Sequence, residues 1–323
     1  MRRPGGALGR AVRVGFVVLA VVLLVLALRD QGPEARAAAR AVGPAVLAGS
    51  LVAVLTGLLA SALCWRALLA DLGTPLGLRA ALGVFFLGQL GKYVPGSVFA
   101  VAAQMELART HGAPRSRVGT AGLLFLGVLV ASGLLVAATV LPLTSPTALR
   151  SYAWVLVLLP LGLAVLAPPV LTRLVALLLK VLRREPLERP LSARGVGAAL
   201  GWALAMWAAY GLHLELLVRT QDTGPALLLS TGAYALAWTA GLLVVAAPAG
   251  AGVREVALVA ALAPVLDRGG ALAVAVLSRV LMTLGDLGWG AVGAVLHHTH
   301  SGAVKTPRRS ADTDREPLDR SPP

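Results

Sequence analysis

The stretch GQLGKYVPG at residues 88–96 interrupts one long apolar segment, 76–108, and PAGAGVRE at residues 248–255 interrupts another, 226–263. Proline removes an amide hydrogen that a helix needs, and glycine weakens a helix, so each stretch predicts a helix break. We interpret the two segments as broken, re-entrant helical hairpins that enter and leave a membrane on one side. A simple kink within a tilted helix pair is the alternative interpretation of each break.

The rest of the chain indicates an all-α polytopic membrane protein. Of 323 residues, 57% are hydrophobic, and the mean hydropathy of +0.80 implies more apolar surface than a soluble protein could bury. A net charge of +14 fits basic loops on anionic lipid better than nucleic acid. Because a bilayer core takes about 20 helical residues, we expect about six full transmembrane helices besides the hairpins, at 12–28, 44–63, 118–141, 152–171, 196–218 and 271–296.

Basic residues predict the orientation of these helices. With both hairpins re-entrant, the loops on the cytoplasmic side carry 19 Lys and Arg and the opposite loops carry six, as the positive-inside rule requires. We therefore expect a protein of the cell membrane with both termini in the cytoplasm. Residues 1–11 would form a cytoplasmic N-terminus, 12–298 the transmembrane domain and 299–323 a disordered tail. Cleavage of 12–28 as a signal peptide is the alternative to an uncleaved first helix.

The two hairpins would enter from opposite sides, which is the pattern of inverted-repeat transporters. Non-helical backbone at membrane depth survives only where protein or water satisfies it, so the breaks predict a polar cavity near the midplane. After Pro95 and Gly96, Ser97 can cap one half-helix. Gly252 can start the other, with Glu255 as a capping carboxylate three residues later. Two such helix N-termini suit an anion such as a lipid phosphate.

Charged side chains deep in the apolar segments number three of each sign, namely Lys92, Arg254, Arg279, Glu215, Glu255 and Asp286. They predict an internally paired network, since a lone charge in hydrocarbon costs about 3 kcal/mol or more. Lys92 is expected either to contact a phosphate or to snorkel or pair with Glu255. Arg254 either binds substrate or pairs with Glu255 at the hairpin tip. Arg279 and Asp286 are seven residues apart on one helix face, which favours a structural pair.

The remaining candidate residues predict neither a metal nor a cofactor site. Cys64 is the only cysteine, which excludes an intrachain disulfide. Near the end of their helix, His213 and Glu215 are expected at the membrane interface rather than in a proton relay. A histidine cluster lies where the last helix meets the basic tail, which argues against metal binding; its members are His297, His298 and His300.

At the two breaks the chain resembles a known family, the lysylphosphatidylglycerol synthase transmembrane region. Its first signature resembles Gly91-Lys92-Tyr93-Val94-Pro95-Gly96-Ser97, and its second resembles Pro248-x-Gly250-x-Gly252-Val253-Arg254-Glu255. Ala249 and Ala251 depart from the glycine and the larger apolar residue of that pattern. The resemblance covers about residues 10–298 and implies a flippase-like membrane domain. We predict as substrate-binding residues Lys92, Tyr93, Pro95, Gly96, Ser97, Gly250, Gly252, Arg254, Glu255, Arg279 and Asp286.

The leading hypothesis is a carrier that moves an anionic lipid, or a lipid-linked headgroup, between leaflets. An enzyme of lipid-linked sugar metabolism, with Glu255 or Asp286 as catalytic carboxylate, is an alternative. A protein that anchors or regulates a membrane partner is another. Because few polar residues follow Leu296, we do not expect the lysyl transfer performed by family members with an added aminoacyl-transferase domain. Expected partners are anionic membrane lipids, with a homo-oligomer or an envelope-biosynthesis partner left open.

Overall fold

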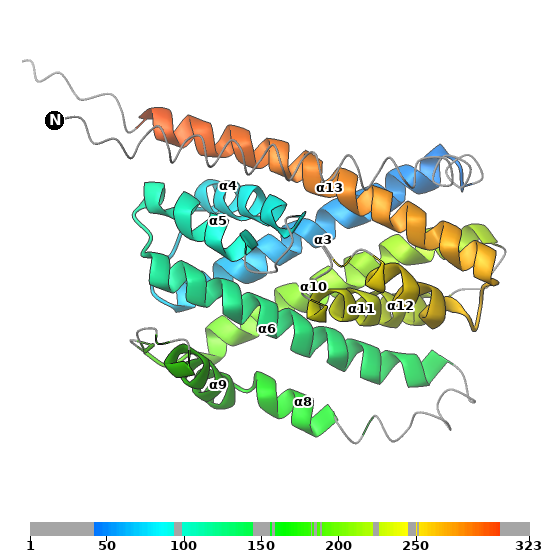
Figure 1. The fold of residues 1–323 in the computed structure, drawn as a ribbon, viewed down its shortest axis with the longest axis horizontal. Helices are drawn as coiled ribbons and strands as arrows, with labels where there is room; N and C mark the ends of the chain where they lie inside the picture. Colours follow the sequence, from blue (N-terminus) through cyan, green and yellow to red (C-terminus); the bar gives the residue numbers. More distant parts are fainter. Residues whose placement is uncertain are drawn as a thin grey trace, which may run out of the picture.

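The computed structural model of the chain describes residues 42–93, 99–144, 156, 159–181, 183, 186–187, 189–221, 226–244, 250 and 252–303. Within these residues every regular element is a helix (Figure 1), which confirms the all-α fold. The predicted first span 12–28 lies outside the described residues, as do Pro95, Gly96 and Ser97 of the first break and Ala249 and Ala251 of the second.

Four of the helices in the described residues are long and apolar enough to cross a membrane. They are α3 (Pro44–Asp71), α6 (Arg115–Val140, continued by the 3-10 turn η3, Leu141–Thr144), α10 (Ala193–Val218) and α13 (Arg268–Ala303). The shortest have 26 residues, or about 39 Å at 1.5 Å per residue, against a bilayer core of about 30 Å. They coincide with four of the six predicted spans, so a multi-pass helical membrane protein is confirmed, and the total of six spans stays a prediction.

The described part of the predicted span 152–171 is divided into two helices. α8 (Leu159–Leu166) ends before Ala167, and α9 (Pro168–Val181) continues ten residues past the predicted end. Pro168 has no amide hydrogen and disfavours the helical conformation of the residue before it, so the helix must be interrupted here. The prediction of one continuous helix over this part is therefore wrong.

Among the described helices, α3 and α10 form the most extensive pair. Their axes approach closely because glycine leaves room for an aromatic ring: a Cβ atom on Gly57 would lie 2.3 Å from Cε1 of Tyr210. Small residues let membrane helices pack at short range in this way. α11 packs against both α10 and α6. This packing holds the Tyr210 side chain fixed in the interior, at 2% exposure.

The first hairpin consists of α4 (Leu78–Gln89), the 3-10 turn η1 (Leu90–Tyr93) and α5 (Phe99–Leu107), followed by η2 (Ala108–His111). Its arms are antiparallel, since Gly91 lies against Ala100 while Gly88, one turn earlier, lies against Gln104, one turn later. A Cβ atom on Gly91 would come within 2.9 Å of the Ala100 amide nitrogen. This contact requires glycine, which gives the first signature a structural reason.

The second hairpin consists of α11 (Leu227–Leu243) and α12 (Val253–Leu262), which pack side by side (Figure 1). Gly250 has a left-handed φ of 73°, and a Cβ atom on it would lie 3.0 Å from the Cα atom of Gly241. Glycine is favoured at such a conformation because it lacks Cβ. Both predicted breaks thus form helical hairpins, and in each a signature glycine brings the two arms together; that the hairpins are re-entrant stays a prediction.

The hairpins approach the middle of α13 from opposite ends. On one side Gly83 lies against Gly293, and Tyr93, at the end of η1, bonds to Asp286. On the other, Glu255 in the first turn of α12 pairs with Arg279. Seven helical residues, or about 10 Å, therefore separate the two hairpin tips along α13.

Candidate functional site

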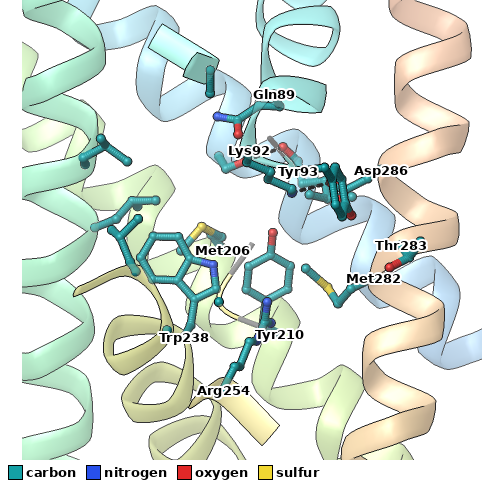
Figure 2. Close-up of a pocket in the computed structure, with 18 of the residues that line it drawn as sticks. Gln89, Lys92, Tyr93, Met206, Tyr210, Trp238, Arg254, Met282, Thr283 and Asp286 are labelled. Carbon is teal, nitrogen blue, oxygen red and sulfur yellow. Dashed lines mark hydrogen bonds and ion pairs between the residues drawn. The ribbon is translucent and has the colours of Figure 1, made fainter. Parts of the chain in front are cut away.

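One cavity of about 130 Å³ lies between the tips of the two hairpins. Lys92 and Tyr93 reach it from the first hairpin, and Gly250 and Arg254 from the second. Figure 2 shows Asp286 of α13 beside Lys92 and Tyr93, Arg254 on the opposite side, and Tyr210 between them. α6 closes another side with apolar groups; they are Phe125, Leu126 and Leu129. The two breaks therefore meet at one chamber that has a charged side and an apolar side.

Asp286 fastens the first hairpin to α13. Its carboxylate accepts a hydrogen bond from Lys92 Nζ at 2.7 Å and another from the Tyr93 hydroxyl at 2.5 Å. Asp286 is 6% exposed and Lys92 29%, so the pair is partly shielded from solvent. Hydrogen bonds to an ionised group are shorter and stronger than neutral ones. Lys92 pairs with Asp286, so the predicted pairing with Glu255 is wrong.

Glu255 performs two functions at the start of α12. One carboxylate oxygen accepts the Gly252 amide hydrogen at 2.7 Å, which is the predicted cap of the half-helix. The other lies 3.7 Å from Arg279 Nη1 of α13. Gly252 is the N-cap residue of α12 and has a left-handed φ of 81°. The second hairpin is therefore fastened to α13 by a carboxylate of its own.

The predicted ion pair between Arg279 and Asp286 is absent among the described residues, because each pairs with a hairpin instead. Residues seven apart on a helix are about 10 Å apart along its axis, which leaves room for a different partner at each. The prediction of an internally paired network is confirmed for these four charges, with the partners exchanged.

Arg254 differs from the other cations of the cavity. Its guanidinium donates to the Tyr234 hydroxyl and lies 4.7 Å from the centre of the Tyr234 ring. In the part of the chain that the structure describes, no carboxylate lies within ion-pair distance of it, so the predicted pair with Glu255 is wrong. Of the three cations that the described residues place on the cavity, two are neutralised by Asp286 and Glu255, and one positive charge remains in excess at Arg254.

His213 and Glu215 lie near the end of α10 as predicted, but both are buried inside the protein. Glu215 accepts from Arg219 Nε, from the Ser230 hydroxyl and from the Ala226 amide at the start of α11. His213 bridges hydroxyl groups of α3 and α13; the partners are Ser50 and Ser278. These two residues connect helices and do not line the cavity.

Apart from Tyr93, the aromatic residues of the cavity were not predicted. Tyr210 and Trp238 line it, and the Tyr234 hydroxyl accepts a hydrogen bond from Arg254. Each lies within an unbroken apolar helix, where it resembles an ordinary core residue or an interfacial anchor. The useful signal in the sequence is a tyrosine within an apolar helix, because its hydroxyl usually needs a polar partner once it is buried.

Comparison with known proteins supplies the last observation. No curated protein matches the chain. A family model does match, that of the lysylphosphatidylglycerol synthase TM region, and the match runs over residues 12–290. It includes both hairpins, the cavity, and the helix that carries Arg279 and Asp286. The chain therefore belongs to the family of the lysylphosphatidylglycerol synthase transmembrane region.

Proposed function

We propose that the protein is a carrier that moves an anionic phospholipid, or a lipid-linked headgroup, between the two leaflets of the membrane. The observation that carries this proposal is the single excess positive charge at Arg254, in a cavity between two hairpin tips. A cation that has no protein counter-charge in a partly buried site is stabilised by an anionic ligand. The family supports a role connected with lipid.

The lengths of the hairpin arms support access from both sides. α4 has 12 residues, α5 has 9 and α12 has 10, so each of these three arms spans about 14–18 Å of a core of about 30 Å. α11, with 17 residues, spans about 26 Å and is the one long arm. A tip would then lie near the middle of the bilayer, reached from opposite sides by the two hairpins. Transporters with broken helices bind their substrates at this depth and expose the site by moving one half against the other.

The chemistry of the cavity supports a headgroup with one phosphodiester. One excess positive charge matches one negative charge, which is the charge of a phosphodiester at neutral pH. The guanidinium of Arg254 can present paired N–H donors to phosphate oxygens. The apolar side, formed by α6, suits the methylene groups next to the headgroup, while the acyl chains stay in lipid.

The alternative of a lipid-linked sugar enzyme is less well supported. Its two candidate catalytic carboxylates are Glu255 and Asp286, and both are held by cations and hydrogen bonds. A general acid or base must exchange a proton with substrate, and these contacts hinder that exchange. Turnover of a polyprenyl-phosphate donor by the purified protein would reverse this preference.

The test is translocation of a fluorescent phosphatidylglycerol in proteoliposomes that contain the purified protein. We expect the wild-type protein to move the lipid and Arg254→Ala to lose most of that activity. Arg109→Ala is the matched control, because Arg109 is exposed and pairs with Glu106 outside the cavity. If a folded Lys92→Ala, Arg254→Ala double variant moved the lipid at the wild-type rate, the proposed mechanism would be wrong.

A further inference from the structure

Asp286 occupies the position on Lys92 that an anionic headgroup would take. Its carboxylate oxygen lies 2.7 Å from Lys92 Nζ, and the Lys92 side chain faces the cavity. Carboxylate and phosphate oxygens accept the same hydrogen bonds from an ammonium group. Without substrate, the protein therefore fills one of its own anion contacts with one of its own carboxylates.

The charges around Asp286 determine what happens when an anion enters. Lys92 and Tyr93 contact it from η1, Arg279 lies two turns away on α13, and Tyr210 and Arg254 face the same cavity from α10 and α12. An anion bound to Arg254 would share this small volume with the Asp286 carboxylate. Two negative charges at close range repel, and Lys92 is a cation that both can use.

We propose that the anionic headgroup displaces Asp286 from Lys92, and that this exchange loosens the tip of the first hairpin on α13. The proposal rests on the proposed function and adds a trigger to it. Tyr93 lies on the same turn, η1, and its hydrogen bond to Asp286 remains after the exchange, so the carboxylate keeps a partner and the tip keeps one of its two bonds to Asp286. The pair of Lys92 with Asp286 holds the tip against α13, and the bound anion favours the loosened state, because the ligand binds that state better.

The geometry of the two ion pairs explains why the first hairpin is the one loosened. The second hairpin contributes the carboxylate of Glu255 to its ion pair with α13, and this carboxylate also caps α12. An anion that displaced Glu255 would leave the Gly252 amide hydrogen without its acceptor. The first hairpin contributes the cation Lys92 to its ion pair with α13, and an anion attracts this cation directly.

The first experiment measures binding of dihexanoylphosphatidylglycerol to the detergent-purified full chain, by titration calorimetry. We expect Asp286→Asn to bind about tenfold more tightly than wild type, because the competing charge is gone while the side-chain shape remains. Lys92→Gln is expected to bind more weakly. In the double variant the gain from Asp286→Asn should vanish, since the two residues act through one contact.

Asp267→Asn is the control for these titrations. Asp267 caps α13 by accepting the Gly270 amide hydrogen, it lies outside the cavity, and asparagine can cap equally well. Its binding constant should equal that of wild type. If the wild-type protein binds the lipid and a folded Asp286→Asn protein binds it no more tightly, displacement is overturned while the proposed function stands. If no protein binds it, the proposed function falls as well.

The second experiment keeps Asp286 and Lys92 unchanged. Leu90 of η1 lies against Gly290 of α13, with the leucine side chain 3.2 Å from a Cβ atom placed on that glycine. A Leu90→Cys, Gly290→Cys pair in a Cys64→Ser background should cross-link readily without lipid. Dihexanoylphosphatidylglycerol should slow the cross-link several-fold, and dihexanoylphosphatidylcholine, which has no net charge, should slow it less. Equal rates with and without the anionic lipid would overturn the loosening of the hairpin tip.

Discussion

The two hairpins use the same backbone device but opposite chemistry. In each, a glycine of the signature lets the arms touch, Gly91 against Ala100 and Gly250 against Gly241. In the first hairpin the ion pair to α13 has its cation on the hairpin, whereas in the second it has its anion there. Similar architecture therefore does not imply similar roles. The first hairpin carries a cation that is already neutralised, and the second carries the excess charge.

The largest expected effect separates two cations of the cavity, Arg254 and Lys92. Arg254→Ala should lower transport of an anionic lipid by about 30-fold or more, because truncating a partly buried charge that binds its partner costs about 2–5 kcal/mol. Lys92→Ala should lower it less, since Lys92 first has to leave Asp286. Initial rates in proteoliposomes measure both. A larger loss for Lys92→Ala would reverse the assignment of the hairpins.

The next effect concerns the glycines at the arm contacts. Gly250→Ala should destabilise the protein by about 1–3 kcal/mol, because the methyl group meets Gly241 and overpacking carries costs of this size. Gly252→Ala is the matched control: its φ is also left-handed, at 81°, but a Cβ atom there meets open space. Thermal melting in detergent should show a smaller shift for Gly252→Ala. Equal shifts would mean that backbone strain, rather than the arm contact, matters at both positions.

The smallest effect tests the cap of α12. Glu255→Gln keeps an oxygen that can accept the Gly252 amide hydrogen, while Glu255→Ala removes both the cap and the pair with Arg279. Loss of a helix cap costs about 1 kcal/mol, so the alanine variant should melt at the lower temperature. If both variants melted together, the pair with Arg279, and not the cap, would account for the stability that Glu255 provides.

Local sequence was sufficient for the features that depend on neighbours along the chain. Proline and glycine at 88–96 and 248–255 predicted the two breaks, and the three-residue spacing of Gly252 and Glu255 predicted the cap. Pro168 carries the same helix-breaking signal, but the apolar run on both sides of it predicts a single transmembrane helix by length and hydropathy. Pro95, Gly96 and Ser97 lie outside the described residues, and their predicted role stays a prediction.

The sequence by itself determined that this is a helical membrane protein with two breaks and a balanced set of deep charges, because hydropathy, helix-breaking residues and capping act over a few residues. Only the tertiary structure decided which charges pair. Lys92 and Asp286 are 194 positions apart, and the seven-residue spacing of Arg279 and Asp286 on α13 fits several partners equally well. The choice follows from which hairpin reaches which half of α13, and helix packing sets that arrangement. As a result, Arg254 is the cation of the cavity that has no carboxylate partner among the described residues.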